Sequence, residues 1–344
     1  MPPGEFSPSA LLAIKLKAEQ IWTDSRLAQE YKANSDSAKA VLENQTATFR
    51  ELDNPEKDNQ IVVNFINPCA IVVEDCVSNC DITEDELESG AKTYTLDLCK
   101  KTGFAVDAEK MRTNTYTVEE QSARGLASAL KALDEYWSQQ VLVKLKAYAG
   151  VNVAPAPWTW AAGTTSVPAA DYTVGMVANL INQSILNKMP GAYYIDNGSL
   201  FVPWLNAQFQ AASFADNGNQ ARIKALKMYF DQWNFAPAGL TEDTFMVTPG
   251  AVAMKTKTRN PDAPTVIGGS VQQTRYTVAS PTLPGVKYDV YYTLKCTTIA
   301  GKAHIVHSWR IETNGGVFLN PEGCPVTIGG TTYTPTGVIS FTKV

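Results

Sequence analysis

Residues 117–150, TVEEQSARGLASALKALDEYWSQQVLVKLKAYAG, decide how the rest of the chain is interpreted. Thr117 and Glu120 have the spacing of a capping box, in which each side chain accepts a hydrogen bond from the backbone N–H of the other residue. Gly150 is typical of a residue that stops a helix. The stretch therefore predicts one helix, which at 1.5 Å per residue would be about 50 Å long.

Apolar side chains recur every three or four residues along this predicted helix and form one continuous stripe. They are Ala123, Leu126, Leu130, Leu133, Trp137, Val141, Leu145 and Tyr148. Five of the charged residues are predicted to fall outside the stripe; they are Lys131, Asp134, Glu135, Lys144 and Lys146. A long helix with one buried face needs a long surface, either a sheet of its own domain or the body of a flat, extended subunit.

The composition is that of a folded chain with a core of normal size. Of its 344 residues, 44% are hydrophobic and 18% are charged, and this length favours about two domains. The net charge is −5 and the pI is about 5.3. Tight non-specific nucleic-acid binding depends on clustered Lys and Arg, so any contact with DNA is expected to be weak.

The sequence predicts a protein that is made and kept in the cytosol. No apolar run approaches the roughly 20 residues of a membrane helix. The first twenty residues lack the basic start and uninterrupted apolar core of a signal peptide. The cysteines do not have the spacing of a disulfide framework and are expected to be reduced; they are Cys69, Cys76, Cys80, Cys99, Cys296 and Cys324.

Residues 1–50 are interpreted as an N-terminal arm. A helical pattern runs from Ser9 to about Asn44, but its apolar stripe is broken. The stripe consists of Leu12, Leu16, Ile21, Trp22, Tyr31 and Val41. A segment of this kind packs on another surface. The alternative is an ordinary N-terminal helix that docks on its own domain.

Residues 51–116 contain two strand-like runs, IVVNFINPCAIVV and TYTLDLCKKTGFAV. Between them lies the most acidic stretch of the chain, with Glu74, Asp75, Asp81, Glu84, Asp85, Glu86 and Glu88. This pattern predicts an extended hairpin with an acidic tip. Because a two-stranded ribbon is marginally stable in water, it must lie on its own domain or on a neighbour.

The middle of the chain, residues 151–285, is expected to alternate helices and strands. Asp171 is predicted to cap an amphipathic helix that ends at Pro190 and Gly191. Its apolar face would contain Val174, Val177, Leu180, Ile181, Ile185 and Leu186. AYYID predicts a strand, and SLFVPWLNAQFQAA and ARIKALKMYFDQWN predict two further helices.

The last part of the chain, residues 286–344, is β-rich. Apolar residues alternate with polar ones in the period of two that indicates a half-buried strand; they are Tyr288, Val290, Tyr292, Leu294 and Cys296. Ala300 and Gly301 predict a turn into HIVHSWRIE, and Asn314 with Gly315 predicts another hairpin turn.

No catalytic, cofactor-binding or metal-binding residue is assigned. His304 and His307 lie three residues apart in a predicted strand, so their side chains would point to opposite faces. Cys76 and Cys80 lack the second pair that a zinc site needs. The glycine pairs of VIGGSV and TIGGTT lack the spacing of a phosphate-binding loop, and the acidic tip lacks that of a calcium loop. The sequence therefore disfavours an enzyme.

The order of the predicted elements resembles the major capsid proteins of tailed bacteriophages, whose HK97-like fold is shared with encapsulins. Two passages carry this resemblance. TYTLDLCKKTGFAV leads through DAEKMRT into TVEEQSARGLASALKALDEYW, similar to a hairpin feeding a spine helix. GAYYIDNGSLFVPWL, followed by FMVTPGAVAMKT, is similar to a central strand and helix of the axial domain and a returning strand. The resemblance covers roughly residues 50–344.

The resemblance implies an α+β fold with five segments. These are an N-terminal arm (1–50), the start of the peripheral domain with an extended hairpin, or E-loop (51–116), the spine helix (117–150), a mainly axial domain (151–285) and a β-rich part that closes both domains (286–344). The arm and the hairpin would reach over adjacent subunits. The adjacent subunits would then supply the surface on which the arm and the hairpin pack.

The resemblance also implies a structural, non-enzymatic function. Subunits of this family self-assemble into hexamers and pentamers of an icosahedral shell around packaged DNA. The expected location is the virion, after assembly in the host cytoplasm. The first fifty residues leave no room for a scaffolding segment, so a separate scaffolding protein is expected, together with a portal and, in some members, a decoration protein.

Some members of the family crosslink a hairpin lysine to a distant asparagine. Residues of the required types lie in both regions, namely Lys92, Lys100, Lys101, Asn314 and Asn320. No motif selects a pair, so no crosslink is assigned.

Two other functions are considered. An encapsulin-like nanocompartment shell would share the fold and differ in its cargo. A soluble carbohydrate-binding or ligand-binding protein, from a different class, would line a cleft with aromatic side chains such as Trp158, Trp160, Trp204 and Trp233. Large aromatic residues more often lie in a core or an interface.

Overall fold

The structure is a computed structural model that describes most of the chain. The described residues are 5–24, 28–51, 59–65, 90–150, 158–161, 164–171, 175–196, 227–231, 244–268, 273–299, 301–320, 326–328 and 330–343. They belong to two compact units. Unit 1 comprises Met1–Ser35, Leu96–Trp137 and Lys255–Gly316, and unit 2 comprises Asp36–Thr95, Ser138–Met254 and Val317–Val344. The predicted α+β class is confirmed.

Unit 1 is built on an antiparallel sheet. Its strands are β4 (Leu98–Asp107), β14 (Lys302–Leu319), β13 (Lys287–Ile299), β12 (Gln273–Ala279) and β11 (Thr265–Ile267), in that spatial order. β10 (Val252–Thr256) also pairs with β14. The predicted turn at Gly301 is confirmed, since this glycine has a φ of +76° between β13 and β14.

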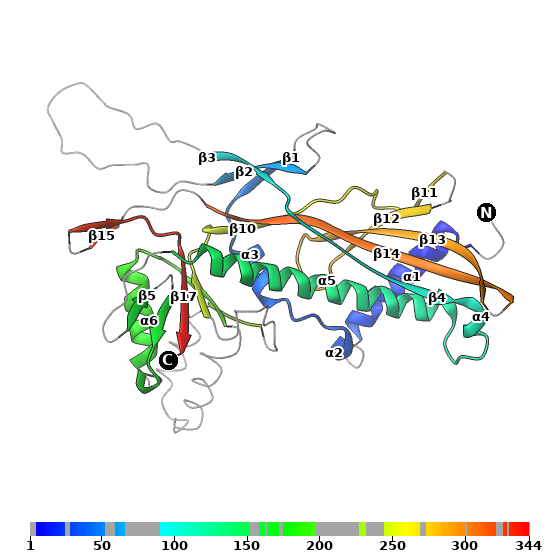
Figure 1. The fold of residues 1–344 in the computed structure, drawn as a ribbon, viewed down its shortest axis with the longest axis horizontal. Coiled ribbons are helices and arrows are strands. Elements are labelled where there is room, and N and C mark those ends of the chain that lie inside the picture. Colours follow the sequence, from blue (N-terminus) through cyan, green and yellow to red (C-terminus); the bar gives the residue numbers. More distant parts are fainter. Residues whose placement is uncertain are drawn as a thin grey trace. The chain divides into compact units, whose positions relative to one another are not determined.

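The long predicted helix is α5 (Val118–Tyr148), the longest helix in Figure 1. Its 31 residues begin at the expected capping box. Thr117 N donates to Glu120 Oε2 (3.0 Å), and Glu120 N donates to Thr117 Oγ1 (3.2 Å). The hydrogen bond from the Thr117 backbone lowers the pKa of Glu120. The division between the two units falls within α5, after Trp137.

The predicted apolar stripe is the buried face of α5. From Ala123 to Leu145 each of its residues is at most 3% exposed. Trp137 Nε1 donates to Thr313 Oγ1 of β14 (3.0 Å). A β-carbon on Gly125 would lie 2.5 Å from the Phe104 ring, so this glycine lets β4 approach the helix closely. The first part of α5 therefore lies against the sheet of unit 1.

The N-terminal region forms three helices where one continuous pattern was predicted. They are α1 (Pro8–Thr23), α2 (Ala28–Tyr31) and α3 (Asp36–Asn44). Ser7 caps α1 by accepting a hydrogen bond from Ala10 N (3.2 Å). The buried face of α1 consists of Leu11, Ile14, Ala18 and Ile21, whereas Leu12 and Leu16 are 45% and 51% exposed. The predicted stripe is therefore wrong at Leu12 and Leu16, and it is correct at Ile21 and at Val41 of α3, which are buried.

Helix α1 packs within unit 1. Lys15 Nζ donates to the carbonyl of Thr277 on β12 (3.2 Å), and Lys17 forms an ion pair with Glu119 of α5 (3.2 Å). A short helix, α4 (Ala108–Met111), follows β4 and is capped by Asp107, which accepts from Glu109 N (3.0 Å).

The described residues of unit 2 form two larger sheets and one small hairpin. β1 (Thr48–Glu51), β2 (Gln60–Phe65) and β3 (Gly90–Thr95) form an antiparallel sheet. A mixed sheet has the order β5 (Thr159–Ala161), β6 (Thr164–Val167), β17 (Val338–Lys343), β9 (Thr244–Val247), β7 (Tyr193–Asp196) and β8 (Lys227–Phe230). β15 (Val326–Ile328) pairs with β16 (Thr331–Tyr333).

Helix α6 (Gly175–Leu186) covers the mixed sheet. Met176 and Leu180 enter a core with Trp158, Tyr194 and Phe341. The predicted apolar face is correct at Leu180 and wrong at Ile181 and Ile185, which are 40% and 68% exposed. Lys188, with a φ of +51°, ends the helix in a Schellman motif, because Met189 N donates to Ser184 O and Lys188 N to Ile185 O.

Three local predictions are wrong. Asp171 does not cap α6: it lies in a 3-10 turn (Ala169–Asp171) and accepts from Trp158 Nε1 (3.0 Å). Lys227–Phe230, within the predicted helix ARIKALKMYFDQWN, is strand β8, which pairs with β7. Asn314 and Gly315 form no turn, since β14 runs through them. Residues 199–212, the other predicted helix, lie outside the described part of the chain.

Gly315 lies inside β14 because the backbone needs space there. A β-carbon at this position would lie 2.5 Å from the Lys255 carbonyl oxygen and 2.7 Å from the Trp137 ring. Close tertiary contact therefore requires a glycine at position 315. In the sequence, this glycine next to Asn314 had suggested a hairpin turn.

None of the helices in the described residues is both long and apolar enough to span a membrane. The predicted arm, hairpin, peripheral and axial segments are defined by their roles in an assembled shell. Their boundaries therefore stay predictions.

Candidate functional site

The two histidines lie on opposite faces of β14, as their spacing predicted. His304 Nδ1 contacts Asp107 Oδ2 at 2.8 Å. His307 is 4% exposed, and its Nδ1 contacts the Tyr292 hydroxyl at 2.9 Å. Burial lowers the pKa of His307. Phe6 packs on the His307 ring with centroids 4.4 Å apart, so this histidine belongs to an aromatic core.

Among the residues that the structure describes, the other sequence candidates do not come together into a site. Cys99 and Cys296 are free and exposed, and the other four cysteines lie outside the described residues. Trp158 is 3% exposed within the unit 2 core, and Trp160 is 37% exposed. Trp204 and Trp233 are also not among the described residues. Over the part of the chain that is described, no three His, Cys, Asp or Glu side chains are placed to hold a metal ion.

Asp134 is a buried residue that sequence reasoning placed outside the helix stripe. It is 0% exposed, and its carboxylate accepts hydrogen bonds from the hydroxyls of Ser280, Thr282 and Tyr288. Burial raises the pKa of Asp134 to about 6, against the lowering effect of these donors. Asp134 lies seven residues after Ala127 and seven residues before Val141, and both of these residues are fully buried. This spacing was the sequence signal that could have placed Asp134 on the buried face of the helix.

Asp231 is a second buried carboxylate, in unit 2. Ser37 N donates to its Oδ2 (3.1 Å), and so does the Ser37 hydroxyl. The carboxylate thus satisfies a free N–H in the first turn of α3, the role of an N-cap supplied by a distant residue. Burial raises the pKa of Asp231 to about 6. Both buried acids link segments that are distant in the sequence through these hydrogen bonds.

A pocket of about 320 Å³ lies between α1 and the first turns of α5. Its lining is Lys17, Gln20, Ile21, Asp24, Tyr116, Glu120, Ala123 and Arg124. The Arg124 guanidinium lies 4.4 Å from the Tyr116 ring centroid. Lys17 pairs with Glu119, and Glu120 takes part in the capping box. Charged side chains of both signs line this pocket. Two of them, Lys17 and Glu120, are already bonded to other residues of the chain.

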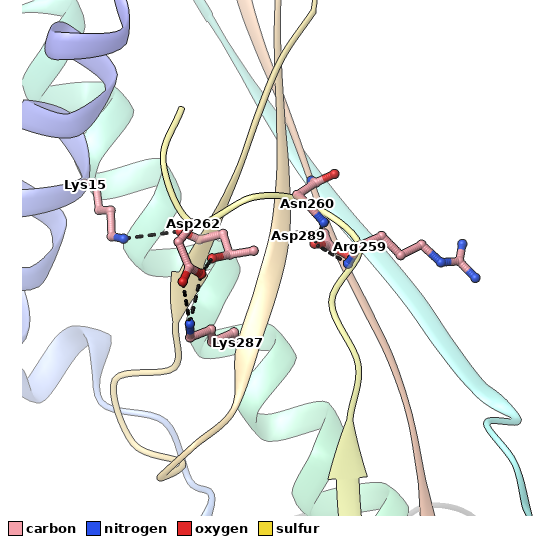
Figure 2. Close-up of polar contacts among 7 residues, drawn as sticks. Lys15, Arg259, Asn260, Asp262, Lys287 and Asp289 are labelled. Atoms are coloured by element: carbon pink, nitrogen blue, oxygen red, sulfur yellow. Dashed lines mark hydrogen bonds and ion pairs between the residues drawn. The ribbon is translucent and has the colours of Figure 1, made fainter. Parts of the chain in front are cut away.

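The face of the unit 1 sheet that points away from α5 is mainly polar. Two acids on this side are held by local contacts, as Figure 2 shows. Asp289 accepts from the backbone N–H groups of Arg259 and Asn260 at 2.9–3.1 Å, and the Arg259 side chain extends away from it. Asp262 accepts from Lys287 Nζ at 2.9 and 3.0 Å. Burial raises the pKa of Asp289, whereas hydrogen bonds from Thr277 and Lys287 lower that of Asp262.

Two arginines flank a tyrosine across three neighbouring strands of this face. The register places Arg275 of β12 opposite Tyr291 of β13, and Tyr291 opposite Arg310 of β14. The two guanidinium carbons lie 5.5 Å and 4.4 Å from the Tyr291 ring centroid. Arg275, Tyr291 and Arg310 are hereafter called the arginine row. Sequence reasoning missed it, because only the register of three strands brings these residues together.

Several known structures that are similar to this chain come from phages. A chain of Mycobacterium phage Che8 has 14% identity and a TM-score of 0.41, over 88% of this chain and 94% of that one. A chain from the mature capsid of bacteriophage PhiM1 has 10% identity and a TM-score of 0.41, over 83% and 82%. A chain from the capsid of Staphylococcus phage Andhra has 12% identity and a TM-score of 0.41, over 86% and 82%.

Two of these structures are described as phage capsids. No protein-family model matches the chain, and no curated protein sequence matches it. At TM-scores of 0.41 the likeness has no weight of its own, so the function proposed below rests on the chain's own elements.

Proposed function

We propose that this chain is the major capsid protein of a tailed phage, with an HK97-like fold. Copies of it would form hexamers and pentamers that close into an icosahedral shell around packaged DNA. The protein would act through its surfaces, without catalysis, and its location would be the virion after assembly in the host cytoplasm.

The pairing of β2 with β3 is the observation that carries this proposal. Phe65 pairs with Gly90, so the two strands meet at the base of the acidic segment 66–89. Ile61, Val63 and Phe65 are buried on β2, whereas four described side chains of β3 are exposed, namely Ala91, Lys92, Thr93 and Thr95. An exposed edge strand is a ready template for contact with another chain. This supports the expected hairpin.

The order of elements after the hairpin gives further support. β3 is followed by β4, α4 and the capped α5, which is the order that the family resemblance implies. In a closed shell, weak contacts between subunits are sufficient, because the symmetry repeats each interface many times. A separate scaffolding protein, a portal and a decoration protein are the partners expected from the resemblance, with weak contact to DNA from a chain of net charge −5.

Electron microscopy tests this function directly. The protein would be purified alone and after co-expression with its neighbouring genes, and imaged in negative stain. Closed angular shells, or hexameric and pentameric rings, are expected. A monodisperse monomer under every condition would overturn the proposal.

The contents of the particles separate a phage capsid from an encapsulin-like compartment. Phage capsids produced with their packaging machinery should contain nuclease-protected DNA. Particles that instead enclose a defined protein cargo would identify a nanocompartment.

A further inference from the structure

The pocket between α1 and the first turns of α5 lies within unit 1, because all of its lining residues belong to that unit. The α1 side contributes Lys17, Gln20, Ile21 and Asp24, and the α5 side contributes Tyr116, Glu120, Ala123 and Arg124. The volume of the pocket is about 320 Å³. Ligand pockets span about 300–1,000 Å³, so this one has the size for a small molecule.

Part of the pocket surface is apolar. Ile21 of α1 and Ala123 of α5 are buried side chains that line it from the two helices. Tyr116 is 42% exposed, so some of its side chain is accessible to a ligand. Pockets that bind small molecules combine apolar walls of this kind with a few polar groups that fix the orientation of the ligand.

Three of the four charged residues that line the pocket are engaged within the chain. Lys17 forms its ion pair with Glu119 at 3.2 Å. Glu120 Oε2 accepts the hydrogen bond from Thr117 N in the capping box. Asp24 also has an interaction within the chain. The recognition of a ligand therefore depends on the fourth charge.

This fourth charge is Arg124, whose guanidinium carbon lies 4.4 Å from the centroid of the Tyr116 ring. Contact with the ring restricts the orientation of the guanidinium plane. Among the described residues, no carboxylate forms an ion pair with Arg124. The hydrogen bond from the Thr117 backbone lowers the pKa of Glu120, and the charges of Lys17 and Arg124 lower it further. Arg124 thus acts on Glu120 through its charge and keeps its N–H donors for a ligand.

We propose that this pocket binds a small organic carboxylate with an apolar body. The carboxylate pairs with the Arg124 guanidinium, whose planar donors match two carboxylate oxygens. The apolar body packs against Tyr116, Ile21 and Ala123. A carboxylate is favoured over a doubly charged phosphate, because Glu120 in the same pocket repels the second negative charge.

A ligand at this position would strengthen the attachment of α1 to α5. The ion pair of Lys17 with Glu119, which joins the two helices, is 42% and 44% exposed, and exposed ion pairs contribute little to stability. A molecule that binds only when both helices are in place stabilises the folded state in proportion to its occupancy. The site lies within one subunit, so the inference does not depend on the proposed capsid function.

Calorimetric titration of the full-length chain with phenylacetate tests the site. Phenylacetate should bind saturably and raise the melting temperature of the protein. Arg124→Gln should weaken binding at least about tenfold, the loss expected for hydrogen bonds to a charged group. Phenylacetamide, which is neutral and has nearly the same shape, should bind the unaltered protein at least about tenfold more weakly for the same reason.

Methyl NMR spectra locate the binding. The methyl resonances of Ile21 and Ala123 should shift with added phenylacetate, because both side chains line the pocket.

Arg112→Gln is the matched control. Arg112 is exposed, does not line the pocket and pairs with Glu109 at 3.1 Å. Its replacement removes the same charge near the start of α5 and should leave the affinity for phenylacetate unchanged. Circular dichroism would verify that both variants are folded.

The inference would be overturned by the absence of saturable phenylacetate binding up to about 10 mM. Equal affinity of a folded Arg124→Gln protein would overturn it, and so would equal affinity of the unaltered protein for phenylacetate and phenylacetamide. Binding that leaves the Ile21 and Ala123 methyl resonances unmoved would place the ligand elsewhere, with the same consequence. The comparison of the two ligands uses the unaltered protein, so it decides the question even if Arg124→Gln does not fold.

Discussion

At the scale of single residues, the buried acid Asp134 makes the stability of the protein depend on pH. The native pKa of about 6 lies above the value near 4 of an unfolded chain. The native state therefore keeps a proton that the unfolded state has lost between these values. The stabilisation is complete below about pH 4 and is lost as the pH rises through about 6, which amounts to about 3 kcal/mol for two pKa units.

Asp134→Asn should remove this contribution, because an amide does not titrate. The difference in unfolding free energy, wild type minus variant, should fall by about 3 kcal/mol between pH 4 and pH 7.5. Denaturant unfolding at the two pH values measures it. Asp231, whose pKa is also raised to about 6, is present in both proteins and cancels in the difference. A difference that does not change with pH would show that the pKa of Asp134 is not raised in the native state.

Gly315 allows a second prediction at this scale. In Gly315→Ala the new β-carbon would meet the Lys255 carbonyl oxygen and the Trp137 ring, at 2.5 Å and 2.7 Å. Overpacking of this kind costs about 1–3 kcal/mol, which denaturant unfolding would reveal. Gly268→Ala is the matched control, since its β-carbon has nothing within 4 Å. Equal stability of the two variants would show that the strand moves aside freely.

At the scale of elements, α5 depends on one face for its packing. Leu133 is 3% exposed on that face, whereas the neighbouring Ala132 is exposed. Leu133→Asp would bury an unpaired charge and should prevent soluble folding, a loss of more than about 4 kcal/mol. Ala132→Asp introduces the same charge into solvent and should express normally. Yield and circular dichroism of the soluble fraction provide the comparison, and a soluble, assembled Leu133→Asp protein would contradict the assigned face.

At the scale of the whole molecule, we expect assembly to depend on the acidic segment. We do not expect folding to depend on it. Replacing Asp81 to Ser89 with a neutral Gly-Ser linker of equal length should leave a folded subunit, because β2 and β3 still pair at its base. The same protein should fail to form normal shells in electron microscopy. A Gly-Ser replacement of the exposed β13–β14 turn around Gly301 controls for general effects of loop changes. Normal shells without the segment would exclude it as a major assembly contact.

The amino-acid sequence by itself determined the elements whose signals are local. The capping box of Thr117 and Glu120 and the apolar stripe of α5 involve residues a few positions apart, so they can be read without knowing the rest of the fold. The alternation of Tyr288, Val290 and Tyr292 is equally local, and all three are fully buried. The acidity of residues 66–89 is a matter of composition.

Tertiary structure decided the features that need a distant partner. Asp134 is buried because Ser280, Thr282 and Tyr288 supply hydrogen-bond donors, and Gly315 stays in a strand because Trp137 and Lys255 leave no room for a side chain. Lys227–Phe230 is a strand because β7 supplies its hydrogen bonds. The arginine row likewise depends on the register of β12, β13 and β14. The physical reason is common to all four: local periodicity selects a helix or a strand, but packing and strand pairing between distant segments select which side chains meet.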